Sequence, residues 1–413
     1  MPSRILATLC VALAIVSVAL VLYINGTFFY MIATKQMASD MASHIIDAKL
    51  VVENKVEVIY KVSIGSKVNI SSKKEPGRYR PQPHPVFHYA LITVKRLLNL
   101  YSYEMAWWYT MMASQIITLA LTTYLVQLGI TKIRLRWCIS TIFGSMLLIS
   151  SSIYIPWYSP NMYVGYLNGN IYHNSTSIIA KPIAYLTMIT MTTWLNKPVH
   201  VPHTRFVILT SIMVVISALA KPNIPLAIIP AWTLLIGFWW STDQSRGWRH
   251  YVIYLIPVFM VALVMFWQAQ IRFDASNTYG ISWWYVAQST TPNPLISLCL
   301  TVAFPISMMV FYPHIRQEKL FQLTFVSFVV AVFTYWLMYE TRNPFHNNFS
   351  WGARIMGSAL FALACAHLLN AYHHITTKGD IVRFSLATSI FTAHILSGIL
   401  YTIQVYQSKY PFI

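Results

Sequence analysis

Charged residues are scarce in this sequence, and acids are the scarcest of them. Only 10% of the 413 residues are charged, with 11 acids against 29 lysines and arginines, whereas 56% are hydrophobic and the mean hydropathy is +0.54. Soluble domains carry charge on about a quarter of their residues, so this composition excludes an ordinary soluble protein. We therefore predict an integral membrane protein, whose net charge of +18 faces anionic lipid headgroups and not nucleic acid.

Cysteine and the common nucleotide-binding motifs are also nearly or wholly missing. The four cysteines, Cys10, Cys138, Cys299 and Cys365, all fall within or beside apolar runs, which excludes a disulfide framework in the loops, and no CxxC pattern occurs. The sequence has no Walker A motif, no GxGxxG, no solenoid repeat and no low-complexity tract. A P-loop enzyme, a dinucleotide-binding enzyme and a repeat protein are therefore excluded.

What the sequence has instead is a series of long apolar runs. Each is close to the ~20 residues that a helix needs to cross the hydrocarbon of a bilayer. We count about eleven: 5–30, 106–128, 137–156, 178–195, 205–220, 224–241, 249–268, 295–313, 320–340, 352–372 and 384–407. The predicted fold is an all-α polytopic membrane protein that forms a single domain over residues 1–413.

Two of these runs leave alternatives open. The first is interpreted as a retained anchor and not as a signal peptide, because its apolar part is long and no convincing small-residue cleavage site follows it. The runs 205–220 and 224–241 flank Lys221-Pro222-Asn223 and are short, so they form either a tight hairpin or a broken, re-entrant pair.

The positions of lysine and arginine in the short connections predict the orientation. With a cytoplasmic N-terminus, every even-numbered connection is basic, while the short outer connections hold only isolated cations such as Lys221, Arg272 and Arg342. The C-terminus is then outside. The first connection, 31–105, is by far the longest and lies on the extracytoplasmic side.

This first outer loop opens with acids in a chain that has few. The segment from Thr34 to about Tyr60 is predicted to be an amphipathic helix on which Asp40, His44 and Asp47 share one side. An adjacent apolar stripe of Met37, Met41, Ile45, Ala48 and Val52 is expected to lie on the membrane surface. The acids would then stand at the level of the outer headgroups.

Later in the same loop, prolines forbid a helix before about His84. His84 and His88 follow one turn apart, as do Asp40 and His44, and a His-x3-His pair on a helix is a possible metal-binding pair, although neither pair has the flanking Glu of an HExxH site. The competing interpretation is that His84 caps or solvates the start of the helix while His88 packs under Tyr89. The sequence leaves open whether a divalent metal ion takes part.

Two further outer connections carry polar and aromatic residues suited to a sugar and a phosphate. The third connection, 157–186, is rich in Asn, Tyr, Gly and Trp, and it places His173 and Asn174 before a span for which Asn174-Ser175-Thr176 resembles a helix N-cap. The connection after residue 339 holds Glu340, Arg342, His346, Asn348, Trp351 and Arg354. Arg342, Arg354 and Lys221 are the cations expected to hold a lipid phosphate or diphosphate; a simple Glu340–Arg342 pair is the alternative.

A membrane chain with about eleven spans, a cytoplasmic N-terminus, a large first outer loop and an acid just after the first span resembles the GT-C superfamily of integral-membrane glycosyltransferases. "ASDMASH" supplies the matching acid, Asp40, although many members carry two adjacent acids where this chain has Ser39-Asp40-Met41. The resemblance implies amphipathic helices in the first loop, an aspartate in the active site and a polyprenyl-phosphate or polyprenyl-diphosphate sugar as donor. It also suggests a bacterial inner membrane, with the active site on the extracytoplasmic face.

Under this hypothesis the enzyme inverts the sugar's configuration as it moves the sugar to a glycan, lipid or protein acceptor. Asp40 is the expected base, His44 orients or assists it, and Asp47 is the second choice of base. The cations above would hold the leaving phosphate. The expected substrate contacts are His84, His88, His173, Asn174, Glu340, His346, Asn348 and Trp351.

Three other functions remain open from the sequence. A transporter or flippase of lipid-linked or small polar solutes predicts acids or helix breaks near the bilayer midplane, and the Lys221-Pro222 break fits it. An envelope oligosaccharide polymerase or ligase usually has its large, arginine-rich outer loop late in the chain, unlike this one. A purely structural membrane subunit would leave the outer His, Asn and Trp residues unexplained.

Overall fold

The computed structural model describes residues 2–37, 39–53, 84–130, 135–162, 166–167, 169–170, 172, 174–197, 204–242, 248–272, 279–341 and 347–409. The elements in chain order are α1 (Pro2–Ala33), α2 (Met41–Glu53), α3 (Pro85–Leu97), α4 (Tyr103–Leu128), α5 (Arg136–Ile149), α6 (Ser175–Leu195), α7 (Thr204–Ala220), α8 (Asn223–Thr242), α9 (Trp248–Ile253), α10 (Ile256–Arg272), β1 (Tyr279–Ile281), α11 (Tyr285–Thr290), α12 (Pro294–Phe311), η1 (Pro313–Gln317), α13 (Lys319–Leu337), β2 (Met338–Glu340), α14 (Ser350–Ala371), η3 (Tyr372–His374) and α15 (Lys378–Ser408).

Helices dominate the fold, and each predicted apolar run contains one. Among the described residues, 9 helices are long and apolar enough to cross a membrane, which supports a polytopic integral membrane protein. One expected span is shorter than predicted, since the helix of the run 137–156, α5, has 14 residues. The run 205–220, already short in the sequence, gives α7 with 17 residues. In the described part of the chain, these two helices are the short ones among the eleven predicted spans.

The run 137–156 is helical only as far as Ile149. Beyond it the chain is extended, and its backbone groups bond to neighbouring helices: the amide of Ser151 donates to the His394 carbonyl (3.1 Å) and the amide of Ile153 to the Leu300 carbonyl (3.1 Å). Ser150 also turns its hydroxyl to the carbonyl of Leu147, which competes with helix continuation. Irregular backbone is tolerated within an apolar bundle when other helices satisfy it in this way.

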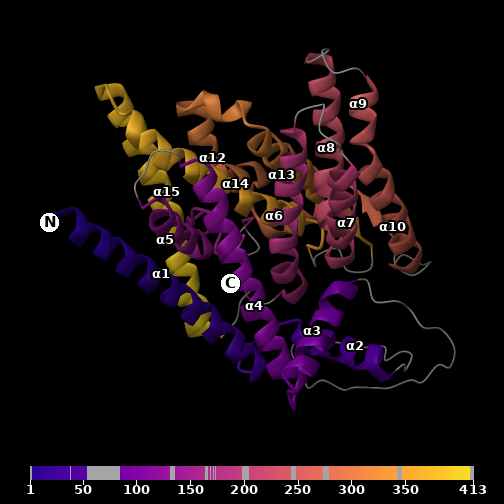
Figure 1. Cartoon of the computed structure of the whole chain (residues 1–413). Coiled ribbons are helices and arrows are strands. Elements are labelled where there is room, and N and C mark those ends of the chain that lie inside the picture. The colour runs from indigo at the N-terminus through magenta and orange to yellow at the C-terminus, as the bar shows by residue number, and fades with distance from the viewer. Residues whose placement is uncertain are drawn as a thin grey trace.

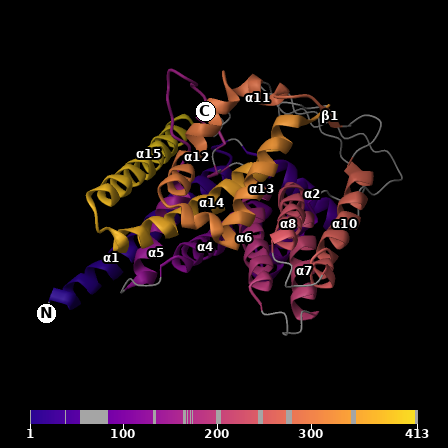
Figure 2. The ribbon, with the colours of Figure 1, turned by 90° about the horizontal axis from the view of Figure 1, so that it is seen from above.

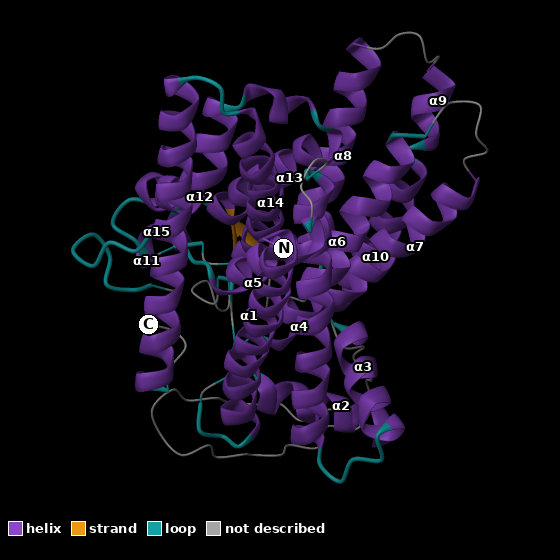
Figure 3. Ribbon diagram, turned by 60° about the vertical axis from the view of Figure 1, so that its left-hand side comes forward, coloured by secondary structure: helices purple, strands orange, loops and turns teal. Residues whose placement is uncertain are grey.

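The run 320–340 also ends differently from the prediction. The helix α13 stops at Leu337, and β2 then pairs antiparallel with β1, with Glu340 opposite Tyr279. This small sheet is the orange pair amid the helices of Figure 3. Because β1 lies far away in sequence, the pairing that ends the helix is not visible in the local pattern.

The core of the bundle is organised around α14. Some 78% of the apolar stretch of α14 is buried, against 11% for α1. The helix contacts α4, α6, α8, α12 and α13, and Figure 2 shows it running between them. By contrast, α1 exposes large apolar side chains, including Ile5, Leu13 and Val16, as a helix in contact with lipid does.

The short helices α2 and α3 lie at one end of the bundle, opposite the end at which α9 lies (Figure 1). Four of the five residues of the predicted apolar stripe do not lie on the membrane surface. Met37, Met41, Ile45 and Ala48 are all buried, in a core that includes Phe87 and Trp107, whereas the side chain of Val52 lies outside the described part of the chain. These buried residues instead pack α2 against α3 and against the start of α4.

Candidate functional site

Asp40 lies immediately before α2 and not within a helix that starts at Thr34. The first helix, α1, ends at Ala33, and Lys35 adopts a left-handed backbone with a φ of 61°, which breaks the helix. The carbonyl of Asp40 accepts from the amide of His44 (3.3 Å), so α2 begins here. The carboxylate of Asp40 is thereby free to turn toward another helix.

That helix is α6. The Oδ1 atom of Asp40 accepts hydrogen bonds from the backbone amide of Ser175 (3.1 Å) and from its hydroxyl (2.7 Å). The Ser175 hydroxyl in turn accepts from Nε1 of Trp107 at 2.9 Å. Ser175 is the first residue of α6, where the helix dipole favours a negative charge. Asp40 is thus held by Ser175 at the start of α6, and Trp107 of α4 holds that serine in turn.

Lys221 reaches the same turn of α6 from the connection between α7 and α8. Its ammonium nitrogen donates to Oδ1 of Asn174 (3.0 Å) and to the hydroxyl of Thr176 (2.9 Å). The side chain is buried, with only 4% of the residue exposed. Asn174 also caps α6 by accepting from the amide of Ser177, which confirms the predicted N-cap. Both of these partners of Lys221 are neutral.

Trp351 joins a second cation to this region. The Lys221 nitrogen lies 4.7 Å from the centre of the Trp351 ring, and the Arg354 guanidinium carbon lies 5.5 Å from it. Arg354 is 1% exposed, and its Nε donates to the hydroxyl of Ser350 (3.2 Å). Two buried cations on one aromatic ring favour an anionic ligand.

The pKa values of Lys221 and Asp40 are set by their burial and by the charged groups near them. Burial lowers the pKa of Lys221 to about 7, although the negative charge of Asp40 opposes this shift. For Asp40, burial by itself raises the pKa, but the charge of His44 and the hydrogen bonds from His44 and Ser175 outweigh burial, so the pKa is lowered. Asp40 is therefore ionised at neutral pH, while Lys221 is poised between its two forms.

Close packing between α8 and α14 positions the two cations. Nδ2 of Asn223 donates to the backbone carbonyl of Asn348 (2.8 Å), just before α14. A Cβ atom at Gly352 would lie 2.9 Å from the carbonyl oxygen of Asn223, so only glycine allows this approach. Lys221 and Trp351 flank this contact in sequence.

Beside Asp40, two histidines and a second acid form a cluster. Nε2 of His44 lies 3.3 Å from Oδ2 of Asp40, and Nδ1 of His44 lies 3.3 Å from Nε2 of His88. The same His88 nitrogen lies 3.8 Å from Oδ2 of Asp47. Burial, reinforced by the charge of His44, lowers the pKa of His88 to about 3 even though the backbone of His84 opposes the shift. His88 is therefore neutral at any physiological pH.

The structure brings together some of the predicted site residues and separates others. Asp40, His44, Asn174, Lys221, Trp351 and Arg354 lie at or next to the start of α6, and Asp47 and His88 adjoin His44. His84 precedes α3 and is not grouped with His88 as a ligand pair, Glu340 lies in β2, and Asn348 contributes a backbone carbonyl. His173, Arg342 and His346 lie outside the described residues.

The sequence did not reveal several residues that build this region. The sequence assigns Ser175 and Thr176 only to capping and Asn223 only to the break after Lys221, yet Ser175 is the main partner of Asp40. Thr176 binds Lys221, and Asn223 joins α8 to the start of α14. No signal in the sequence points to Trp107 or Gly352. The one local signal was the neighbouring Asn174-Ser175-Thr176 cap. The remaining contacts join helices that are distant in sequence.

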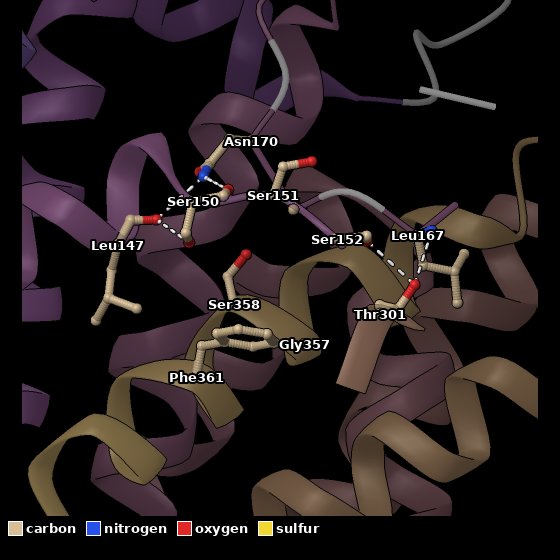
Figure 4. A pocket seen from close by; sticks show the side chains of 11 residues that line it. Leu147, Ser150, Ser151, Ser152, Leu167, Asn170, Thr301, Gly357, Ser358 and Phe361 are labelled. Carbon is tan, nitrogen blue, oxygen red and sulfur yellow. Dashed lines mark hydrogen bonds between the residues drawn. The ribbon is translucent and has the colours of Figure 1, made fainter. Parts of the chain in front are cut away.

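A second polar region lies deeper in the bundle and is drawn in Figure 4. A pocket is lined by the extended segment Ser150, Ser151 and Ser152 together with Asn170, Thr301 and Ser358. Lys181 of α6 donates to Oδ1 of Asn170 (3.2 Å) and to the carbonyl of Gly169 (3.3 Å). Ser358 lies one turn beyond Arg354 on α14 and donates to its carbonyl (3.0 Å).

Comparison with known proteins adds no family. No family model matches the chain, and no curated protein matches its sequence. The resemblance to GT-C glycosyltransferases therefore depends on the predicted topology and on Asp40.

Proposed function

We propose that the chain is a membrane glycosyltransferase that takes a sugar from a polyprenyl-phosphate or polyprenyl-diphosphate donor on the extracytoplasmic side. The observation that carries the proposal is the meeting of Asp40 and Lys221 at the first turn of α6. An ionised carboxylate and a buried cation with two neutral partners are the groups that this transfer needs. The many apolar helices supply the membrane setting in which a prenyl chain is soluble.

Asp40 is the proposed base. It takes the proton of the acceptor hydroxyl as the hydroxyl oxygen bonds to the anomeric carbon. The bond from that carbon to the donor's phosphate oxygen breaks at the same time, and inversion follows from attack on the opposite face. His44, 3.3 Å from Oδ2 of Asp40, orients the carboxylate. The bonds from Ser175 occupy Oδ1, so Oδ2, which faces His44, is the oxygen proposed to take the proton.

Lys221 and Arg354 are the proposed phosphate-binding cations. The phosphate leaves as an anion, so it needs stabilising positive charge and no proton. Both cations lie against the ring of Trp351, so the compact ammonium of Lys221 and the planar guanidinium of Arg354 are close to each other. Asn174 acts here by positioning Lys221, because its oxygen is engaged with that lysine and with the cap of α6.

The test is a transfer assay on the purified full chain in liposomes. Short-chain polyprenyl-phosphate and polyprenyl-diphosphate sugars that differ in the labelled sugar are supplied together with a membrane extract as the source of acceptors. The wild type is expected to release the polyprenyl phosphate or diphosphate of one donor and to label an acceptor. Asp40→Asn should transfer about 100-fold more slowly or worse, because general-base catalysis typically contributes about 10²–10⁴.

Glu104→Gln is the matched control, since it removes an acid from the first turn of α4 at the same end of the bundle. It should retain the wild-type rate. If Asp40→Asn transferred as fast as the wild type, the base assignment would be wrong. If no donor were consumed by the wild type, the enzyme class itself would be wrong.

One observation favours a second candidate, a transporter or flippase of polar or lipid-linked solutes. The helix α5 breaks at Ile149, and the extended segment after it lines a polar pocket near Lys181. Irregular backbone that lines a cavity is typical of transport sites. Uptake of an unmodified solute into sealed vesicles, lost in Lys181→Met and retained in Asp40→Asn, would favour this function over transfer.

A further inference from the structure

Three metal-ligand side chains from two helices converge on one point beside Asp40. His44 and Asp47 lie one turn apart on α2, and His88 comes from α3, which packs against α2. One ligand atom of each residue lies within 4.8 Å of the other two. This set shares only His88 with the His84–His88 pair considered from the sequence. The packing of α3 against α2 brings His88 to His44 and Asp47.

Two of the three separations are close to those around a small divalent ion, and all three ligand atoms lie within 4.8 Å of one another. Zn²⁺ binds imidazole nitrogen at about 2.0–2.1 Å, which in a tetrahedral site places neighbouring ligand atoms about 3.3–3.4 Å apart. The His44–His88 nitrogens are 3.3 Å apart already. The His88–Asp47 separation of 3.8 Å requires only a small movement, and the Asp47 side chain is 25% exposed and can make it without disturbing the core.

The ring of His44 has the outer partner that metal-bound histidines usually have. Its Nε2 faces Oδ2 of Asp40 at 3.3 Å while its Nδ1 faces the cluster. When Nε2 carries the proton and donates it to the carboxylate, Nδ1 presents its lone pair to the cluster. A carboxylate behind a histidine fixes the tautomer and orientation of a ligand in this way.

We infer that His44 Nδ1, His88 Nε2 and the carboxylate of Asp47 bind one divalent transition-metal ion, with Zn²⁺ the best match. Two imidazoles and one carboxylate are a donor set that Zn²⁺ and its neighbours in the first row prefer, whereas Mg²⁺ and Ca²⁺ prefer all-oxygen sites. With three protein ligands, a tetrahedral ion keeps a fourth position for water or substrate.

The consequence for catalysis rests on the proposed function. An ion on Nδ1 holds the His44 ring in place, and that ring contacts the proposed base. The ion is therefore expected to help position Asp40. The binding claim itself is independent of any transferase activity, since it concerns the resting protein.

The experiment measures metal binding by the purified full chain, carrying an affinity tag that contains no histidine. The metal-free protein is titrated with Zn²⁺ and, separately, with Mg²⁺. We expect one Zn²⁺ per chain and no Mg²⁺ binding at the same concentrations. Asp47→Asn and His88→Ala should each weaken Zn²⁺ binding at least tenfold.

His84→Ala should bind Zn²⁺ like the wild type and so distinguishes the two histidine pairings. The double variant His373→Ala, His374→Ala removes an exposed pair at the end of α14 and controls for surface histidines. Equal Zn²⁺ affinity in the wild type and Asp47→Asn, or loss of binding only in the surface double variant, would overturn the inference.

X-ray absorption of the zinc-loaded wild type tests the site without any substitution that might impair folding. Two imidazole ligands together with oxygen ligands are expected around the ion. A shell of oxygen alone, or one that contains sulfur, would contradict the assignment. Failure of the transfer assay with intact Zn²⁺ binding would refute the proposed function and leave the metal site standing.

Discussion

Asp40 and Lys221 are held by the same turn of α6 although they lie far apart in the sequence. Ser175 donates to Asp40 through its amide and hydroxyl, and Thr176 accepts from Lys221 at 2.9 Å. Asp40 and Lys221 thus bond to two neighbouring residues of the turn, Ser175 and Thr176, and not to each other. An anionic ligand that binds to Lys221 would lie next to the proposed base.

Removing the charge of Lys221 should weaken donor binding. In Lys221→Gln the amide can still contact Asn174 and Thr176, but the ammonium charge is lost. A hydrogen bond to a charged group contributes about 1.5–3 kcal/mol, so the KM for the donor should rise roughly 10- to 100-fold. Lys197→Gln, which follows α6 at its other end, is the control and should keep the wild-type KM. An unchanged KM in Lys221→Gln would remove this residue from the donor site.

Donor binding should also weaken as the pH rises above neutrality. The pKa of Lys221 is lowered to about 7 by burial, so the ammonium form that binds an anion predominates below that pH and is depleted above it. A bound anion raises the pKa of Lys221. Between the pKa of the free protein and that of the complex, the affinity for the anion should fall by up to about tenfold per pH unit. The measurement is the Kd of a polyprenyl-diphosphate analogue between pH 6 and about 9.

Lys221→Arg provides the control for that profile. Arginine stays protonated throughout this range, so its affinity for the same analogue should be flat with pH. A wild-type profile as flat as that of the arginine variant would show that Lys221 does not titrate on binding.

Local patterns in the sequence were enough to predict the helices but not how they end. The apolar runs each contain a helix, the prolines before His84 are followed by α3 at Pro85, and Asn174 caps α6. These features depend on residues close together in the chain. The early end of α5 and the β1–β2 pair depend on distant partners, namely His394, Leu300 and β1 itself.

The candidate site shows the same limit. Spacing placed His44 and Asp47 on one side of a helix, but for His88 it could offer only His84 as a nearby ligand, because periodicity relates only residues of one helix. The alternative interpretation, with His84 at the start of the helix and His88 packed, agrees with α3, where His84 precedes the helix and His88 is buried. Which helices pack together is decided by buried surfaces such as the Met41–Ile45 stripe against Phe87. The capping role of Ser175 was visible in the sequence, while its bond to Asp40 required the residue before α2 to meet the first residue of α6.

Ser175→Ala should shift the acid limb of the activity profile. The hydroxyl of Ser175 helps to lower the pKa of Asp40, so its removal raises that pKa. A base must be ionised, and activity is lost as the pH falls through its pKa, so the acid limb of kcat/KM should move to higher pH. Ser177→Ala, two residues on in the same turn, leaves the Asp40 contacts intact and should not move the limb.

The same substitution has a structural effect that must be measured separately. Nε1 of Trp107 loses its acceptor in Ser175→Ala, which costs about 1–3 kcal/mol when the group stays buried. Thermal unfolding in detergent reports this loss. A lower Tm without any movement of the acid limb would mean that Ser175 serves only the packing of α4 on α6.

The contact of Gly352 with Asn223 tests whether the approach of α8 to α14 positions the two cations. In Gly352→Ala the added Cβ would lie 2.9 Å from the carbonyl oxygen of Asn223, so α8 and α14 must move apart. Overpacking of this kind costs about 1–3 kcal/mol. Because Lys221 and Trp351 flank the contact, donor affinity should fall together with the Tm.

Gly237→Ala is the matched comparison, since it adds the same methyl group to α8 where no atom lies within 4 Å. Alanine favours a helix over glycine by up to about 1 kcal/mol, so this variant should be as stable as the wild type or more so. Both variants are compared by Tm in detergent and by the Kd of the diphosphate analogue. A Gly352→Ala protein with the Tm and Kd of Gly237→Ala would show that the α8–α14 approach does not position the two cations, and the phosphate site would then have to be sought elsewhere on the described helices.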